Sequence, residues 1–212
     1  MNHTIVRIVI GLLTFRIVVS LGWRWGCRKW SLPCPACLAW VLENSVFQKL
    51  LGTATTLKRI GLRSGQRVLE IGPGPGRLLL PAAQQVLPGG EVIGIDIQKG
   101  MLDRLTLRAI ERNVSNLKTI HGDATQPHVP EASCDVVILG EALGEITDRA
   151  AVLAQCFRAL KPGGVLSVTE IVIDPHYQFR STVKRFAERT GFRLQSIEGS
   201  WRFFTANFVK PD

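Results

Sequence analysis

Residues 66–77 read Gln-Arg-Val-Leu-Glu-Ile-Gly-Pro-Gly-Pro-Gly-Arg, and this stretch decides the fold. The apolar run at 67–71 predicts a short buried parallel strand. Glycines then alternate through 72–76, and because these glycines have no Cβ atoms, the backbone can approach a ligand closely. Residues 77–86 are compatible with a helix. A strand, a glycine turn and a helix in this order are typical of a nucleoside- or phosphate-binding corner in a doubly wound sheet.

The residues after the turn indicate which nucleotide it binds. Arg77 stands where a dinucleotide fingerprint has its third glycine. A second strand at 91–96 ends in Asp96, twenty residues after Gly76, where a carboxylate can accept both ribose hydroxyls of an adenosine. A third strand end carries Asp123, and a carboxylate there can accept the amino group of adenine. The pattern therefore favours an adenosine-containing cofactor over a dinucleotide.

The rest of the catalytic region continues the alternation of strands and helices. Further strands are expected at 134–140, 165–170, 192–197 and 203–210, with a sharp turn at 160–164 and helices at 45–62, 99–112, 147–160 and 180–190. The short link between the last two strands predicts an antiparallel hairpin. On the helix at 99–112, the charged side chains are expected to form one solvated face, made of Asp103, Arg104, Arg108 and Glu111.

Four short blocks carry a family resemblance. They are Val68–Gly76, Gly94–Asp96, Gly122–Ala124 and Leu160–Gly164. In this order and at this spacing, the region of roughly 50–172 resembles the class I S-adenosylmethionine-dependent methyltransferases. Within that family it is similar to the small-molecule, type 11-like branch, which includes quinone C-methyltransferases and phospholipid N-methyltransferases. The resemblance implies an α/β, Rossmann-like doubly wound sheet of seven strands in the order 3-2-1-4-5-7-6, with the last strand antiparallel.

The resemblance also implies roles for the residues around the glycine turn. Asp96 would hold the ribose hydroxyls, Ile97 would pack on the adenine, and Asp123 would accept from its amino group. Glu70 would brace the turn or meet the ammonium group of S-adenosylmethionine through water. Glu70 could also brace the turn without touching a ligand, and Asp123 could cap the turn that follows it. The implied cofactor-binding set is Glu70, Gly72, Pro73, Gly74, Gly76, Asp96, Ile97, Asp123, Ala124 and Gly140.

The reacting end is expected beyond the fourth and fifth strands, because ligands in open α/β sheets bind past the carboxyl ends of the strands. Positioning carries much of a methyl transfer, and a base is needed only where the acceptor must lose a proton. The candidate bases are Glu141, Glu145 and His176. Glu145 could instead cap or brace the next helix, and His176 could be an exposed loop residue. The fourth strand lacks the Asn/Asp-Pro-Pro-aromatic motif of enzymes that methylate planar nitrogen in DNA bases or glutamine.

Charge is concentrated in the first part of the chain. The 212 residues carry a net charge of +9. Residues 1–60 hold eight basic residues and one acid, which is +7, and the remainder, with 18 basic and 16 acidic residues, is only +2. A nucleic-acid reader would be expected to show basic clusters near its site. The distribution therefore favours membrane phosphates over nucleic acid as the partner of residues 1–45.

Residues 1–45 are predicted to be a membrane-anchoring leader ahead of a catalytic domain at 46–212. The apolar stretch 5–21 would form a helix about 25 Å long, interrupted by Arg7 and Arg16, and followed by tryptophans that alternate with basic residues. It could span the bilayer, lie in the interface or be a cleaved targeting peptide. The basic cluster places the catalytic domain on the cytoplasmic side, although a mitochondrial transit peptide is an alternative.

The cysteines do not predict a metal site. Cys34 and Cys37 have the spacing of metal ligands, but neither a second cysteine pair nor a nearby histidine completes four ligands. A redox pair and plain packing beside the membrane are the other readings. Cys134 and Cys156 fall in apolar segments and are expected to be buried.

Together these features predict a membrane-attached enzyme that methylates a lipophilic small molecule or a lipid headgroup, with S-adenosylmethionine as its cofactor. A protein lysine methyltransferase acting on a membrane protein is one alternative. A non-catalytic, membrane-tethered binding module that keeps the fold is another. The accepting atom and the oligomeric state are not determined by the sequence.

Overall fold

A computed structural model describes Gly22, Gly26 and residues 51–212. Its centre is a sheet of seven strands in the order β3-β2-β1-β4-β5-β7-β6. The strands are β1 (Arg67–Ile71), β2 (Glu91–Asp96), β3 (Leu117–His121), β4 (Cys134–Gly140), β5 (Leu160–Ile171), β6 (Arg193–Ser200) and β7 (Phe203–Val209). β1 to β5 are parallel to one another, and β7 is antiparallel to both β5 and β6. The expected strand order and the antiparallel last strand are confirmed.

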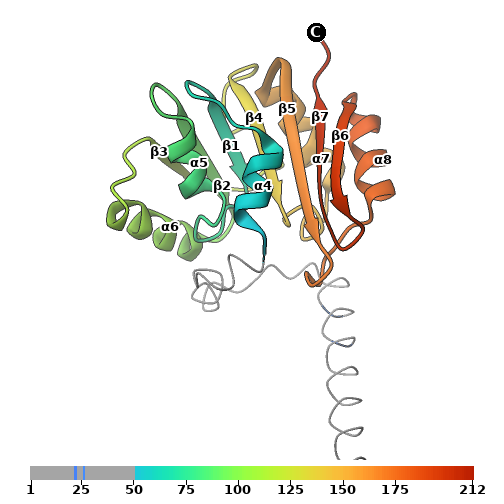
Figure 1. Cartoon of the computed structure of the whole chain (residues 1–212), viewed down its shortest axis with the longest axis horizontal. Helices are drawn as coiled ribbons and strands as arrows, with labels where there is room; N and C mark the ends of the chain where they lie inside the picture. Colours follow the sequence, from blue (N-terminus) through green and yellow to red (C-terminus); the bar gives the residue numbers. More distant parts are fainter. Residues whose placement is uncertain (1–21, 23–25, 27–50) are drawn as a thin grey trace, which may run out of the picture.

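Within residues 51–212, five helices cover the two faces of this sheet (Figure 1). They are α4 (Thr53–Ile60), α5 (Leu79–Gln85), α6 (Lys99–Glu111), α7 (Arg149–Ala159) and α8 (Arg180–Thr190). Side chains of α4, α5 and α6 share one hydrophobic cluster, whereas those of α7 and α8 belong to the other. Because successive strand residues point to opposite faces, Val68 packs in the first cluster and Leu69 in the second.

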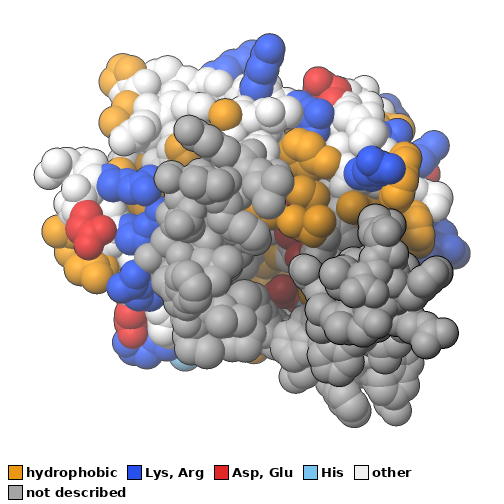
Figure 2. All heavy atoms as spheres, turned by 60° about the horizontal axis from the view of Figure 1, so that its bottom comes forward, with side chains coloured by type: hydrophobic (Ala, Val, Ile, Leu, Met, Phe, Trp, Pro, Cys, Tyr) orange, Lys and Arg blue, Asp and Glu red, His pale blue; other side chains and the backbone are white. Residues whose placement is uncertain are grey.

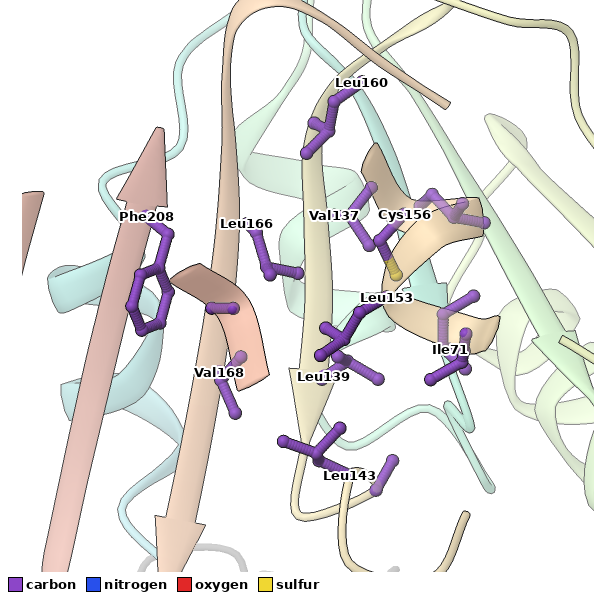
Figure 3. Packing of buried hydrophobic residues seen from close by; sticks show 14 of the residues in the cluster. Ile71, Val137, Leu139, Leu143, Leu153, Cys156, Leu160, Leu166, Val168 and Phe208 are labelled. Atoms are coloured by element: carbon purple, nitrogen blue, oxygen red, sulfur yellow. The ribbon is translucent and has the colours of Figure 1, made fainter. Parts of the chain in front are cut away.

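The core between the sheet and α7 is the larger of the two clusters (Figure 3). Leu153 and Cys156 of α7 lie against Val137 and Leu139 of β4, and all four are at most 1% exposed. Each large side chain buried in this way contributes roughly 1.5–3 kcal/mol. Cys134 and Cys156 are both buried and free, as the sequence indicated.

The observed boundaries differ most from the expected ones at the start of β5 and the start of α4. The strand expected at 165–170 begins at Leu160, because the 160–164 turn is itself tied into the sheet. Gly163 donates to the Lys210 carbonyl at 2.9 Å, and Lys210 donates back to the Gly164 carbonyl at 2.9 Å. The helix expected at 45–62 is described only from Thr53, since Gly52 precedes it with φ of 65° in the left-handed region. Residues 45–50 lie outside the described part of the chain.

Apart from Gly22 and Gly26, the predicted leader at 1–45 also lies outside the described residues, including its apolar stretch 5–21 and the cysteines at 27, 34 and 37. Within the part that the structure describes, no helix is long and apolar enough to cross a membrane. The membrane-spanning interpretation of residues 5–21 therefore stays a prediction.

Candidate active site

The glycine turn lies at the carboxyl end of β1. Gly72, Gly74 and Gly76 all have positive φ angles, of 67°, 53° and 86°. Gly72 donates to the Ile95 carbonyl at 2.8 Å, which ties the turn to β2. A Cβ atom added to Gly74 would meet none of the described residues within 4 Å, whereas one added to Gly76 would clash with a methyl carbon of Leu105. Gly74 therefore borders open space and Gly76 faces the core.

This difference makes a prediction about two alanine substitutions. Gly76→Ala is expected to lower the free energy of unfolding by about 2 kcal/mol, from backbone strain and overpacking together. Gly74→Ala meets only the backbone strain, so its loss of stability is smaller, but its methyl group would obstruct a ligand that lies on the turn. Urea unfolding and cofactor titration of both variants check this. Equal losses of stability would contradict the conclusion that Gly76 faces the core while Gly74 borders open space.

Arg108 lies on α6 and contacts the glycine turn, so the prediction that its side chain is solvated was wrong. Arg108 was expected on a solvated helix face, but it is only 4% exposed. Its guanidinium donates to the carbonyl of Pro75 inside the turn. A buried guanidinium needs such acceptors to offset its lost hydration. The sequence offered no signal for this contact, because it joins residues 33 apart.

Asp96 is joined to the turn as well as to α6. Its carboxylate accepts from Gly74 N at 3.2 Å and from Gln98 N at 2.9 Å. Burial raises the pKa of Asp96, and the hydrogen bonds from Gln98 and Gly74 oppose that shift. The next residue, Ile97, is 62% exposed. The carboxylate of Asp96 could accept from a ribose, and the exposed side chain of Ile97 could pack on the adenine ring beside it.

Glu70 is buried below the turn at the end of β1, with 2% of its surface exposed. Among the described residues, its Oε2 has no hydrogen-bond partner. Burial raises the pKa of Glu70 from 4.5 to about 8, although the Arg77 guanidinium acts in the opposite direction. A buried acid with one unsatisfied oxygen is costly unless a ligand or water completes it.

The raised pKa of Glu70 predicts a pH dependence of stability. The folded state holds the proton more tightly than the unfolded state, so this stability is fully present below pH 4.5 and is lost as the pH rises through about 8. Glu70→Gln removes the ionisation, so the variant should gain stability relative to the wild type over that window. Denaturant unfolding at a series of pH values measures the difference, with the exposed Glu111→Gln as control. A difference that does not change with pH would contradict the assignment.

Arg77 and Glu141 form an ion pair between the start of α5 and the loop after β4. Their side chains are only 9% and 12% exposed. The Arg77 guanidinium donates to Glu141 Oε2 and, at 3.4 Å, to the Thr53 hydroxyl. Burial raises the pKa of Glu141 and Arg77 counteracts that shift. Glu141, a candidate base, therefore forms an ion pair with a cation. This role of Arg77 was not predicted from the sequence, because Arg77 was considered only as standing where a dinucleotide fingerprint has a glycine.

The backbone at Glu141 is strained. Its φ of 57° lies in the left-handed region that residues other than glycine seldom adopt. Glu141 N donates to the Thr169 carbonyl at 2.9 Å, which fixes this loop to β5. Next to it, a Cβ atom on Gly140 would lie 2.5 Å from Leu78, so only glycine fits there without a shift. Strain of this kind is concentrated at functional sites.

Asp123 caps the turn after β3, as the alternative interpretation anticipated. Its Oδ1 accepts from Thr125 N at 2.9 Å. That backbone hydrogen bond lowers the pKa of Asp123 and keeps the side chain ionised. An ionised carboxylate has more acceptor positions than one donor fills, so the cap is compatible with a contact to adenine. Ala124, beside it, packs against the core in a partly buried position.

His176 and Glu145 come together at the carboxyl end of the sheet. His176 is buried, with 3% exposed, so the exposed-loop interpretation was wrong. Its Nδ1 lies 3.8 Å from Glu145 Oε1 and 3.8 Å from Asp174 Oδ1. Glu145 does not cap the next helix, because Asp148 does so by accepting from Ala151 N at 2.9 Å. The structure thus pairs two of the three candidate bases.

A pocket of about 220 Å³ lies beside this pair and is lined by Gly144, Arg149, Tyr177, Gln178 and Phe179. Arg149 donates to the carbonyls of Leu143 and Gly144 at 3.0 and 2.9 Å, which fixes the loop that carries Glu145. Glu170 is buried close by and accepts from Gln178 N at 2.9 Å. Burial raises the pKa of Glu170 well above its ordinary value.

These residues fit an S-adenosyl cofactor. Gly74 borders open space, Asp96 lies beside the turn, and Glu70 keeps an unsatisfied buried oxygen among the described residues. The described residues contain no group of three or more His, Cys, Asp or Glu placed to hold a metal ion.

Comparison with known proteins agrees with this geometry. Residues 68–164 match the family model described as a methyltransferase domain. A demethylmenaquinone methyltransferase of Geobacillus sp. (strain WCH70) is 35% identical over 109 residues, which are 51% of this chain and 47% of that protein. Nocamycin O-methyltransferase of Saccharothrix syringae is 37% identical over 113 residues, 53% of this chain and 40% of that protein. The chain thus spans about half the length of these relatives or less.

Solved structures share the fold. A SAM-dependent methyltransferase from Aquifex aeolicus superposes with a TM-score of 0.77 at 18% identity, over 84% of this chain and 100% of that chain. Phosphoethanolamine N-methyltransferase 2 of Haemonchus contortus, in complex with S-adenosyl-L-methionine, superposes with a TM-score of 0.65 at 21% identity, over 76% of this chain and 52% of that chain.

Proposed function

We propose that the chain methylates a lipophilic small molecule or a lipid headgroup at a membrane, with S-adenosylmethionine as its cofactor, because residues 68–164 match the methyltransferase-domain model. The observation that carries this proposal is the glycine turn bonded to Asp96, on a sheet whose carboxyl end also holds a pocket lined by Gly144 and Tyr177. A relative named for demethylmenaquinone supports a small-molecule acceptor. The tryptophan- and arginine-rich residues 1–45 support a membrane location, with the catalytic domain on its cytoplasmic side.

The cofactor contacts that we propose are those the family resemblance implies, and the positions of the side chains are compatible with them. Asp96 accepts the ribose hydroxyls, Ile97 packs on the adenine, and Asp123 accepts from the adenine amino group. The turn at 72–76 lies against the ribose and methionine parts, and Glu70 braces it from below. When bound, S-adenosylmethionine supplies an activated methyl group on a sulfonium. The work of the protein is to orient the acceptor and to exclude water from it.

At the reacting end, His176 and Glu145 are proposed to take a proton from an acceptor that must lose one. His176→Gln should then lower kcat by about 100-fold, in the range expected for a general base, and should leave the affinity for the cofactor unchanged. Steady-state kinetics with calorimetry on the same preparation measures both. A fall in cofactor affinity that matches the fall in rate would mean that His176 only supports the fold.

The acceptor class is tested by incubating the full chain with methyl-labelled cofactor and a lipid extract. We expect label in the organic phase, and far less of it with Asp96→Ala at the same cofactor concentration. Label confined to water-soluble metabolites would contradict the proposed acceptor. Labelled protein bands on a gel would instead support the protein-methylating alternative.

A further inference from the structure

Three large apolar side chains are exposed together at the carboxyl edge of the sheet. Ile173 and Phe179, in the loop between β5 and α8, are 51% and 61% exposed, and Trp201, between β6 and β7, is 58% exposed. Single exposed apolar residues are ordinary, but a contiguous group marks an interaction site. These three side chains indicate an interaction site only if they form one continuous surface.

The loop and the turn are bonded to each other. Val172 N donates to the Arg202 carbonyl at 2.7 Å, and the Tyr177 hydroxyl donates to the Trp201 carbonyl. The Tyr177 ring also packs edge-on against Phe179, with 5.4 Å between ring centroids. The two segments thus present one continuous surface.

Basic groups accompany these apolar side chains. The Arg202 guanidinium lies 5.0 Å above the Trp201 ring, and Arg180 lies 5.4 Å above the Phe204 ring and donates to the Gly199 carbonyl at 2.6 Å. Figure 2, which looks toward this end of the sheet, shows hydrophobic side chains next to Lys and Arg side chains. We call Ile173, Phe179, Arg180, Trp201 and Arg202 the aromatic–arginine face.

This face borders the acceptor end of the site. Phe179 lines the pocket described above, together with Gly144 and Tyr177. Those two residues are the chain neighbours of Glu145 and His176. An acceptor leaving a surface in contact with Phe179 would therefore have only a short path to the proposed bases.

We infer that the aromatic–arginine face lies in the headgroup layer of an anionic phospholipid bilayer and turns the pocket toward the lipid. Tryptophan and other aromatic rings favour that layer, and arginines beside them are attracted to anionic lipid. Arg180 and Arg202 give this face a positive charge that complements such a surface. This inference rests on the proposed function, because it supplies the route by which a lipophilic acceptor reaches the site. It concerns a surface of the catalytic domain, distinct from residues 1–45.

A photo-crosslinking residue in place of Phe179 tests the inference in the full chain. The protein carries p-benzoylphenylalanine at position 179 and is mixed with vesicles of phosphatidylcholine and labelled phosphatidylglycerol. The matched control carries the same residue at Ile110, which is 69% exposed on α6. We expect a lipid adduct at 179 and none at 110. Both changes replace exposed apolar side chains, so folding should be preserved.

The basic part of the face is tested in the same experiment. Arg180→Gln and Arg202→Gln together should lower the yield of the 179 adduct several-fold, because each basic group near the surface adds to the attraction. No lipid adduct at position 179, or crosslinks there only to residues 1–50 or to a second copy of the chain, would overturn the inference. Methyl transfer to an acceptor dissolved in detergent is measured in parallel, so failure of the proposed function is seen separately.

Discussion

Replacing Arg77 by methionine is expected to lower the free energy of unfolding by about 3–5 kcal/mol, the usual result of removing one member of a buried ion pair. The Arg77 guanidinium contacts Glu141, and both side chains are nearly inaccessible to water. Arg77 also opposes the effect of burial on Glu70. Its removal leaves two buried carboxyl groups without their cation, and urea unfolding measures the loss.

Two further variants separate this effect from a general loss of packing. The double change Arg77→Met with Glu141→Gln should lose less than the single change, because it removes the uncompensated charge. Lys161→Met breaks the more exposed pair with Asp135, whose atoms are 2.6 Å apart, and should cost about 1 kcal/mol or less. If Arg77→Met costs no more than Lys161→Met, the buried pair does not stabilise this corner of the fold.

Asp96→Ala is expected to weaken the binding of S-adenosylmethionine by roughly 300-fold, which corresponds to the loss of two hydrogen bonds to a charged group. Asp96 lies at the end of β2, where its carboxylate already accepts from Gly74 and Gln98. The change should also loosen the turn slightly, so stability is measured alongside affinity by calorimetry and urea unfolding.

Asp103→Ala is the matched control, since Asp103 lies on the adjoining helix in an exposed pair with Lys99. It should leave affinity unchanged. If the Asp96→Ala variant is folded and binds the cofactor as tightly as the wild type, Asp96 does not hold the ribose hydroxyls.

The strands were predicted closely because their signals are local. β1, β2 and β4 are short apolar runs bounded by glycine or an acid, and the structure gives them the expected limits. Parallel strands that are buried on both faces are nearly continuous apolar runs, so such short runs predict them well. The glycines of the 160–164 segment predict a turn, yet the segment is part of β5 and is bonded to Lys210, the residue after β7.

The polar part of the site was less predictable, because its contacts join residues far apart in the chain. Arg77 reaches Glu141 across 64 positions, and Arg108 reaches Pro75 across 33. A charged residue on a helix is usually solvated, so its sequence neighbours could not reveal that Arg108 is buried. Likewise, only the folded loop shows that Glu145 lies next to His176 and leaves the helix cap to Asp148.

Calorimetric titration of the full chain with S-adenosylmethionine, and with its demethylated product S-adenosylhomocysteine, tests the central claim most directly. We expect both compounds to bind at one site per chain, and we expect Asp96→Ala to weaken the binding of both greatly while Asp103→Ala leaves it unchanged. A folded wild-type protein that binds neither compound would contradict the account and would leave a methyltransferase fold serving only as a scaffold.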